Sequence, residues 1–131
     1  MKTLVVDDEF VARRILQRFL SKYGCSDAAV DGQEALDAVR AALEEHEPYD
    51  LICLDVWLPK VDGQQVLEEL RALERAHGID MGRGSWVIMT TSARSKEYVM
   101  GAFRGGADAY LTKPIEVAAL TKELTTLGLL K

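Results

Sequence analysis

Short apolar runs alternate with segments of helical periodicity along the whole chain. Five runs have the length and continuity of buried strands, namely 3–6, 25–30, 51–54, 86–90 and 109–112. Apolar residues at helical spacing follow each run, in the sets Val11, Ile15, Phe19 and Leu20; Ala35, Leu36, Val39 and Leu43; Val66, Leu67, Leu70 and Leu73; Val99, Ala102 and Phe103; and Val117, Leu120, Leu124 and Leu127. Strands that are apolar throughout are buried on both faces, so the pattern predicts an α/β domain with helices on both sides of a parallel sheet.

Composition narrows the class of protein. The 131 residues suit one globular domain over 1–131, with no separate effector domain, and the formal net charge of -5 disfavours nucleic-acid binding, which needs a basic face. No apolar run approaches the roughly 20 residues of a membrane span, and the acidic N-terminal stretch is unlike a signal peptide. We therefore expect a cytoplasmic protein in which Cys25 and Cys53 are buried free thiols. The glycine-rich stretch 77–85 is predicted to be a loop.

Polar residues stand at the end of four of the five predicted strands. They are Asp7, Asp8 and Glu9 after the first strand, Asp55 after the third, Thr90, Thr91 and Ser92 at the fourth, and Lys113 with Pro114 after the fifth. In an open α/β sheet the carboxyl ends of the strands form the ligand site, so these groups are expected to meet at one edge.

Three carboxylates gathered at one edge need a compensating charge. At about 4 Å and an effective dielectric near 20, each like-charged pair costs roughly 4 kcal/mol. Asp7, Asp8 and Asp55 therefore suggest a hard divalent cation such as Mg²⁺, and Lys113 supplies a further positive charge. Taken singly, each signal has an ordinary explanation as a helix start, a cap or a loop. The order and spacing of the whole set carry the inference.

The motifs LVVDDE, DLICLDVWLP with DG, VIMTTSA and GGADAYLTKP, with the spacings between them, resemble the response-regulator receiver domain of the CheY type. The resemblance covers nearly the whole chain. It implies a flavodoxin-like, doubly wound, five-stranded parallel sheet with strand order 2-1-3-4-5 and five helices, a fold that obeys the general rule for ligand sites in open α/β sheets.

The resemblance also implies the chemistry of the site. Asp55 is similar to the phosphoacceptor, Asp8 to a direct Mg²⁺ ligand, and Asp7 to a ligand acting through water. The backbone carbonyl of Trp57 would be another ligand. Lys113 would bind the phosphoryl group. The donor would be a phosphohistidine on a histidine kinase or a phosphotransfer protein, and the downstream target would be a protein that the sequence does not identify.

Two further positions resemble the family's switch residues. Thr91 matches the hydroxyl residue that responds to phosphorylation, which leaves Thr90 as the expected last strand residue. Tyr110 matches the aromatic residue of the fifth strand that moves with it. The Lys113–Pro114 peptide bond is expected to be cis. Phosphorylation would then repack the face made by the fourth helix, the fifth strand and the fifth helix.

The chain departs from the family pattern beside the site. Trp57 is bulky, Ala93 is small, and Ser92 adds a hydroxyl where a plain small residue is usual, while the 77–85 loop is longer than typical. These positions bear on the lifetime of the phosphoryl group and on the partner surface.

The resulting prediction is a signalling protein, not an enzyme beyond its own phosphorylation and dephosphorylation, that is a monomer or a weak phosphorylation-dependent dimer. A degenerate receiver that binds partners without phosphorylation is the alternative. A haloacid-dehalogenase-type phosphatase would need a second Asp where Trp57 stands, and the acidic first loop disfavours a flavin phosphate.

Overall fold

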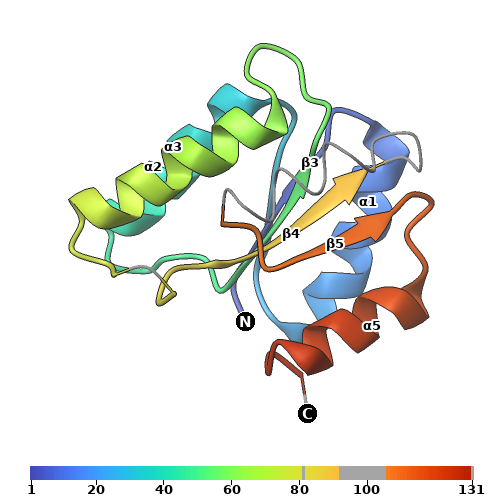
Figure 1. Ribbon diagram of the computed structural model, residues 1–131. Helices are drawn as coiled ribbons and strands as arrows, with labels where there is room; N and C mark the ends of the chain where they lie inside the picture. The colour runs from blue at the N-terminus through green and yellow to red at the C-terminus, as the bar shows by residue number, and fades with distance from the viewer. Residues whose placement is uncertain (81, 92–105, 131) are drawn as a thin grey trace.

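The computed structural model describes residues 1–80, 82–91 and 106–130 as five parallel strands with helices on both faces (Figure 1). The strands are β1 (Thr3–Val6), β2 (Ser26–Ala29), β3 (Leu51–Asp55), β4 (Trp86–Thr91) and β5 (Ala109–Thr112). The helices are α1 (Phe10–Leu20), the 3₁₀ turn η1 (Ser21–Tyr23), α2 (Gly32–Glu44), α3 (Gly63–Ala76) and α5 (Val117–Thr126). The helix expected around Val99, Ala102 and Phe103 lies outside the described residues.

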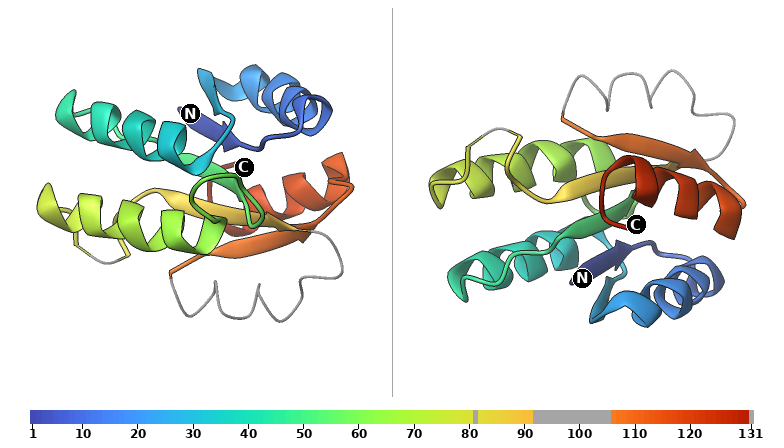
Figure 2. Two further views of the ribbon diagram at one scale, coloured as in Figure 1. Left: turned by 90° about the horizontal axis from the view of Figure 1, so that it is seen from above. Right: turned by 90° about the horizontal axis from the view of Figure 1, so that it is seen from below.

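The sheet has the order β2-β1-β3-β4-β5, and every neighbouring pair is parallel, as predicted. Helices α2 and α3 cover one face, and α1 and α5 cover the other, which both views in Figure 2 show. Each face has its own apolar core because successive strand residues point to opposite sides. Leu4 and Val6 of β1 belong to the α2/α3 core, whereas Val5 belongs to the α1/α5 core.

Two sequence-based expectations about burial are wrong. Strand β2 lies at the edge of the sheet and is mostly exposed, so Cys25 just before it is an exposed thiol, while Cys53 in β3 is buried as expected. The inward stripe of α1 consists of Leu16, Phe19 and Leu20, and it leaves Val11 and Ile15 59% and 52% exposed. Helical spacing alone does not choose between adjacent stripes. The contacts with the sheet make that choice.

A polar network joins the end of α3 to the starts of β4 and β5. The Arg71 guanidinium donates to Glu74 Oε1 at 2.8 Å, to the carbonyls of Ser85 and Gly106 at 2.8 Å each, and to Asp108 Oδ2 at 3.2 Å. The second Glu74 oxygen accepts the Ser85 backbone N–H at 2.7 Å. Glu74 is 4% exposed, and a buried carboxylate is costly unless it is paired and hydrogen-bonded. We therefore assign this network a structural role.

Within the described part of the chain, no helix combines the length and the hydropathy that crossing a membrane requires.

Candidate functional site

Three carboxylates meet at the carboxyl edge of the sheet. Strands β1 and β3 are neighbours, with Val6 opposite Leu54, so the next residues, Asp7 and Asp55, emerge side by side. One carboxylate oxygen from each of Asp7, Asp8 and Asp55 lies within 4.8 Å of the others. Asp7 and Asp55 are buried and Asp8 is exposed. The sequence predicted this gathering, except that Asp55 is the last residue of β3 and does not follow it.

Lys113 places its ammonium group between the two buried carboxylates. Its Nζ lies 2.7 Å from Asp7 Oδ2 and 3.0 Å from Asp55 Oδ2, where it donates a hydrogen bond. The contact with Asp7 is an ion pair whose angles fall outside those of a hydrogen bond. Lys113 reaches this position because its backbone N–H donates to the Thr91 carbonyl at 2.7 Å, at the end of β4. The Lys113–Pro114 bond is cis, as expected.

Backbone N–H groups hold the remaining oxygens of the two buried carboxylates. Glu9 N–H donates to Asp7 Oδ1 at 2.9 Å, and Trp57 N–H donates to Asp55 Oδ1 at 3.1 Å. Each carboxylate thus accepts the backbone N–H two residues later and stabilises a turn at the start of the loop that follows its strand, as Asp side chains commonly do. Sequence reasoning missed these two donors and the Lys113–Asp7 pair. The available signal in the sequence for the two N–H donors was an Asp followed by a residue whose backbone N–H lies two positions later, the spacing that permits such turns.

The electrostatics of the site are dominated by burial. Desolvation raises the pKa of Asp55 above its ordinary value of 3.8, against the opposing effects of Lys113 and of the Trp57 N–H, and with a further rise from Asp7. Burial by itself would lower the pKa of Lys113, but its close contacts with the negatively charged Asp7 and Asp55 carboxylates raise it overall. Ionisation of Asp55 in the folded protein therefore costs more free energy than ionisation of a carboxyl group in water.

This cost predicts a pH-dependent stability difference between the wild type and Asp55→Asn, measured in metal-free buffer. Because the folded state raises the Asp55 pKa, its contribution to stability falls as the pH rises from 3.8 through the raised value. The Lys113 contribution is complete below its ordinary 10.5 and is constant in this window. We expect Asp55→Asn to be about 1 kcal/mol more stable at neutral pH, since the substitution removes the desolvation cost of a buried negative charge.

Urea unfolding of both proteins between about pH 3 and pH 8 measures this difference. The two curves should converge at the acidic end, where the wild-type carboxyl is protonated in both the folded and the unfolded state. A wild type that is the more stable protein at neutral pH would contradict the account.

The loop after β3 is fastened to α2 and packed against β3. Asp31 caps α2 by accepting Glu34 N–H at 2.8 Å, and its other oxygen lies 3.3 Å from Nζ of Lys60, which has a positive φ of 70°. At the end of the loop, Gly63 N–H donates to the Val56 carbonyl at 2.9 Å. Within this loop Trp57 is 53% exposed, and its backbone N–H donates to Asp55 Oδ1 at 3.1 Å.

The two expected switch residues lie on the last two strands. Thr91 is buried and is the last residue of β4, one residue beyond the expected end, because it pairs with Thr112 of β5. Tyr110 is partly buried and packs against the α2/α3 core. The structure thus places Thr91 next to Lys113, whose backbone N–H it accepts, whereas Tyr110 lies nearer the start of β5. Ser92 and Ala93 lie outside the described residues.

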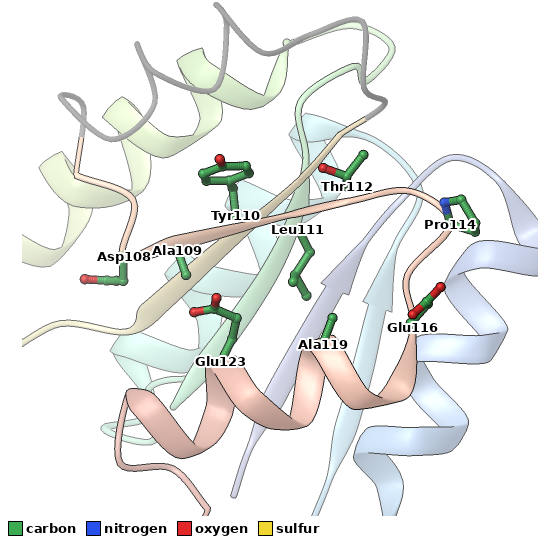
Figure 3. Close-up of a pocket in the computed structure, with 9 residues that line it drawn as sticks. All are labelled: Asp108, Ala109, Tyr110, Leu111, Thr112, Pro114, Glu116, Ala119 and Glu123. Carbon is green, nitrogen blue, oxygen red and sulfur yellow. The ribbon is translucent and has the colours of Figure 1, made fainter.

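A hollow of about 530 Å³ lies between β5 and α5 (Figure 3). Its lining includes Tyr110 and the acidic residues Asp108, Glu116 and Glu123. The hollow belongs to the face that the sequence predicted to respond to phosphorylation.

The donor set at the sheet edge suits a hard divalent cation. Carboxylate oxygens are the ligands that Mg²⁺ prefers, and a site with one or two protein carboxylates is usual for it. Asp7 supports the fit, because it belongs to the cluster and its buried Oδ2 accepts no hydrogen bond from the described residues, with the Lys113 ammonium as its ion-pair partner. The residues present therefore match an Mg²⁺ site.

Comparisons with known proteins agree with this geometry. A family model described as the response regulator receiver domain matches residues 3–125. The osmosensing histidine protein kinase SLN1 of Saccharomyces cerevisiae is 32% identical over 127 residues, which cover 95% of this chain and 10% of that protein. The chain thus spans a small part of this curated relative.

Solved structures share the fold. A chain of the co-crystal structure of the Saccharomyces cerevisiae phosphotransfer protein Ypd1 with the receiver domain of Ssk1 matches with a TM-score of 0.80 and 27% identity, covering 95% of this chain and 86% of that one. The receiver domain of the histidine kinase CKI1 from Arabidopsis thaliana, complexed with Mg²⁺ and BeF3⁻, matches with a TM-score of 0.78 and 27% identity, covering 95% and 89%.

Proposed function

The chain belongs to the response regulator receiver family, and on that premise we propose that Asp55 accepts a phosphoryl group from a phosphohistidine of a histidine kinase or a phosphotransfer protein. The observation that carries the proposal is the position of Asp55. It ends a buried strand, has a lysine ammonium at 3.0 Å, and shares the sheet edge with two further carboxylates.

The chemistry follows from positioning and charge. One Asp55 oxygen attacks the phosphorus atom, the N–P bond of the donor breaks, and its electron pair stays on the leaving imidazole. Lys113 turns from the carboxylates to a phosphoryl oxygen and offsets its charge. Mg²⁺ would be held by Asp7, Asp8, Asp55 and the Trp57 carbonyl, and when bound it supplies positive charge against the incoming phosphoryl oxygens.

The same arrangement supports a switch. The Thr91 hydroxyl donates to a phosphoryl oxygen, and Tyr110 repacks on β5 next to the β5–α5 hollow. Moving a two-state equilibrium from 1:99 to 99:1 takes about 5.5 kcal/mol. Charge-assisted hydrogen bonds from Thr91 and Lys113 to one phosphoryl group are of the right size to supply it. The output is docking to a protein target by a cytoplasmic monomer or a weak phosphorylation-dependent dimer.

This proposal gives the chain no turnover of a free substrate. It catalyses only its own phosphorylation and dephosphorylation, because Asp55 lacks a second carboxylate two residues on that would act as an acid and a base. Position 57 is tryptophan, and its backbone N–H is engaged with Asp55.

Intact-mass spectrometry after incubation with acetyl phosphate tests the proposal. We expect one phosphoryl adduct that needs Mg²⁺, is cleaved by hydroxylamine as an acyl phosphate is, and is absent in Asp55→Asn. Asp37→Asn is the matched control, because Asp37 is an exposed residue of α2. It should be labelled like the wild type.

An adduct that persists in Asp55→Asn would overturn the assignment of the phosphoacceptor. A protein that takes up neither Mg²⁺ nor a phosphoryl group would instead be a phosphorylation-independent binding module.

A further inference from the structure

We propose that the ion pair between Lys60 and Asp31 is a latch that positions the loop between β3 and α3 for cation binding at the acidic edge. Lys60 is a positioning residue in this proposal, because it acts through the loop backbone and not through a contact with the cation. The inference deepens the proposed function and rests on its assignment of the Trp57 carbonyl to the cation.

The backbone of Lys60 is strained. Two described residues other than glycine have a positive φ, namely His46 at 59° and Lys60 at 70°. His46 follows the C-cap of α2, where a left-handed residue is a common helix ending. Lys60 instead lies in the middle of its loop, and the Val61 N–H donates to the Pro59 carbonyl at 2.8 Å around it. This bond closes a γ-turn, and the form with positive φ is rare and strained, so surrounding contacts have to hold it.

The side chain of Lys60 supplies one such contact. Its Nζ lies 3.3 Å from Oδ2 of Asp31, in the turn that leads into α2. The Asp31 side chain is 9% exposed, and its Oδ1 is fixed at the start of α2 by the Glu34 N–H at 2.8 Å. The Lys60 side chain is 68% exposed, so the pair adds little to the overall stability. Its effect is local, because one partner is already fixed on the helix.

The turn before α2 also packs directly on the loop. A Cβ added to Gly32 would lie 2.5 Å from the Val61 carbonyl oxygen and 2.8 Å from the Val61 Cβ. The backbone of this turn is therefore in close contact with the loop one residue beyond Lys60. The ion pair and this packing together hold the strained γ-turn against the start of α2.

The loop connects this constraint to the site because both of its ends are tied. At its start the Trp57 N–H donates to Asp55 Oδ1 at 3.1 Å, and at its end the Gly63 N–H donates to the Val56 carbonyl at 2.9 Å. Lys60 stands three residues after Trp57 inside this closed stretch. When the latch opens, the γ-turn relaxes and the Trp57 backbone moves with it. The Trp57 carbonyl then lies away from the position in which it serves the cation.

Isothermal titration calorimetry with MgCl₂, at fixed pH and ionic strength, tests the latch in two single variants. Lys60→Met removes the ammonium group and keeps an unbranched side chain. Asp31→Asn removes the carboxylate charge and keeps a side chain that caps helices about equally well. We expect the Mg²⁺ dissociation constant to rise about threefold to tenfold in each variant, at or below the low end of the roughly 10–100-fold loss typical of groups that orient metal ligands.

The direction of the two changes separates the latch from a simple effect of charge. Loss of a positive charge near the site would by itself tighten Mg²⁺ binding, and loss of a negative charge would weaken it. The latch predicts weaker binding in both variants. The double variant Lys60→Met with Asp31→Asn should bind no more weakly than the weaker single variant, since both substitutions break the same contact. Lys60→Arg should bind Mg²⁺ about as well as the wild type, because a guanidinium also pairs with a carboxylate.

Two control variants remove the same charges from exposed positions. Asp37→Asn changes an exposed residue of α2, and Lys122→Met changes an exposed residue of α5. Both should keep the wild-type Mg²⁺ affinity. Urea unfolding of every variant should give a midpoint close to that of the wild type, so that weaker Mg²⁺ binding reports the loop and not a loss of the fold.

A second measurement needs no cation. In amide NMR spectra of the metal-free protein, the Trp57 signal should shift in both Lys60→Met and Asp31→Asn. It should stay in place in Asp37→Asn and Lys122→Met.

The inference is overturned if Lys60→Met binds Mg²⁺ as tightly as the wild type or more tightly. Its failure is distinguishable from failure of the proposed function. Labelling of Asp55 by acetyl phosphate, with unchanged Mg²⁺ affinities in both single variants, would overturn the latch alone. A wild type that binds no Mg²⁺ would contradict the proposed function, and a shifted Trp57 amide signal in both variants would then still support the latch on the loop.

Discussion

Replacing Arg71 with methionine should lower the free energy of unfolding by about 3–5 kcal/mol, the loss typical of a buried ion pair that loses one partner. The Arg71 side chain is 19% exposed and that of Glu74 is 5% exposed, so water does not replace the lost contacts well. The variant leaves the Glu74 carboxylate with the Ser85 backbone N–H as its remaining hydrogen-bond donor within the described residues. Asp108 loses the same guanidinium, and burial already raises its pKa.

Urea unfolding measures the loss as a lower midpoint at an unchanged slope. Arg75→Met is the matched control, because Arg75 is an exposed arginine of the same helix, and its loss should stay within about 0.5 kcal/mol. The double variant Arg71→Met with Glu74→Leu should be more stable than Arg71→Met alone, because it also removes the buried Glu74 carboxylate that the single variant leaves without its cation. Equal effects at positions 71 and 75 would contradict the structural role of the network.

Replacing Gly63 with alanine should both destabilise the fold and slow phosphorylation. A Cβ at this position would overlap the Asp55 carbonyl oxygen and lie 2.8 Å from the Val56 Cα, so the start of α3 must move away from the end of β3. Backbone atoms cannot yield as a flexible side chain does, and overpacking of this kind costs roughly 3 kcal/mol. The same shift displaces Asp55, and a misplacement of about 1 Å can cost roughly 100-fold in rate.

The measurements are urea unfolding and the initial rate of acetyl phosphate labelling at saturating Mg²⁺. Gly78→Ala is the control, because Gly78 has a positive φ of 81° and nothing within 4 Å of an added Cβ. That variant should lose about 1–2 kcal/mol from backbone strain and keep the wild-type labelling rate. A Gly63→Ala protein that is labelled as fast as Gly78→Ala would show that the contact does not position Asp55.

The sequence by itself determined the parallel sheet and the gathering of the acidic residues. Alternation of apolar runs with helical spacing leaves few ways to bury both faces of the strands, and parallel strands bring their carboxyl ends to one edge. Asp7 and Asp55 therefore had to meet once β1 and β3 were neighbours. That neighbourhood came from the resemblance to receiver domains and not from the apolar pattern.

Only the tertiary structure decided which side chains are buried and how the buried charges are paired. The stripe of α1 that faces the sheet excludes Val11 and Ile15, and β2 is exposed because it is an edge strand. Lys113 pairs with Asp7 as well as with Asp55, and Arg71 bonds the carbonyl of Gly106, 35 residues away in sequence. The physical reason is the same in each case. Periodicity reports neighbours along the chain, whereas burial and charge pairing depend on groups that only the folded chain brings within a few ångströms.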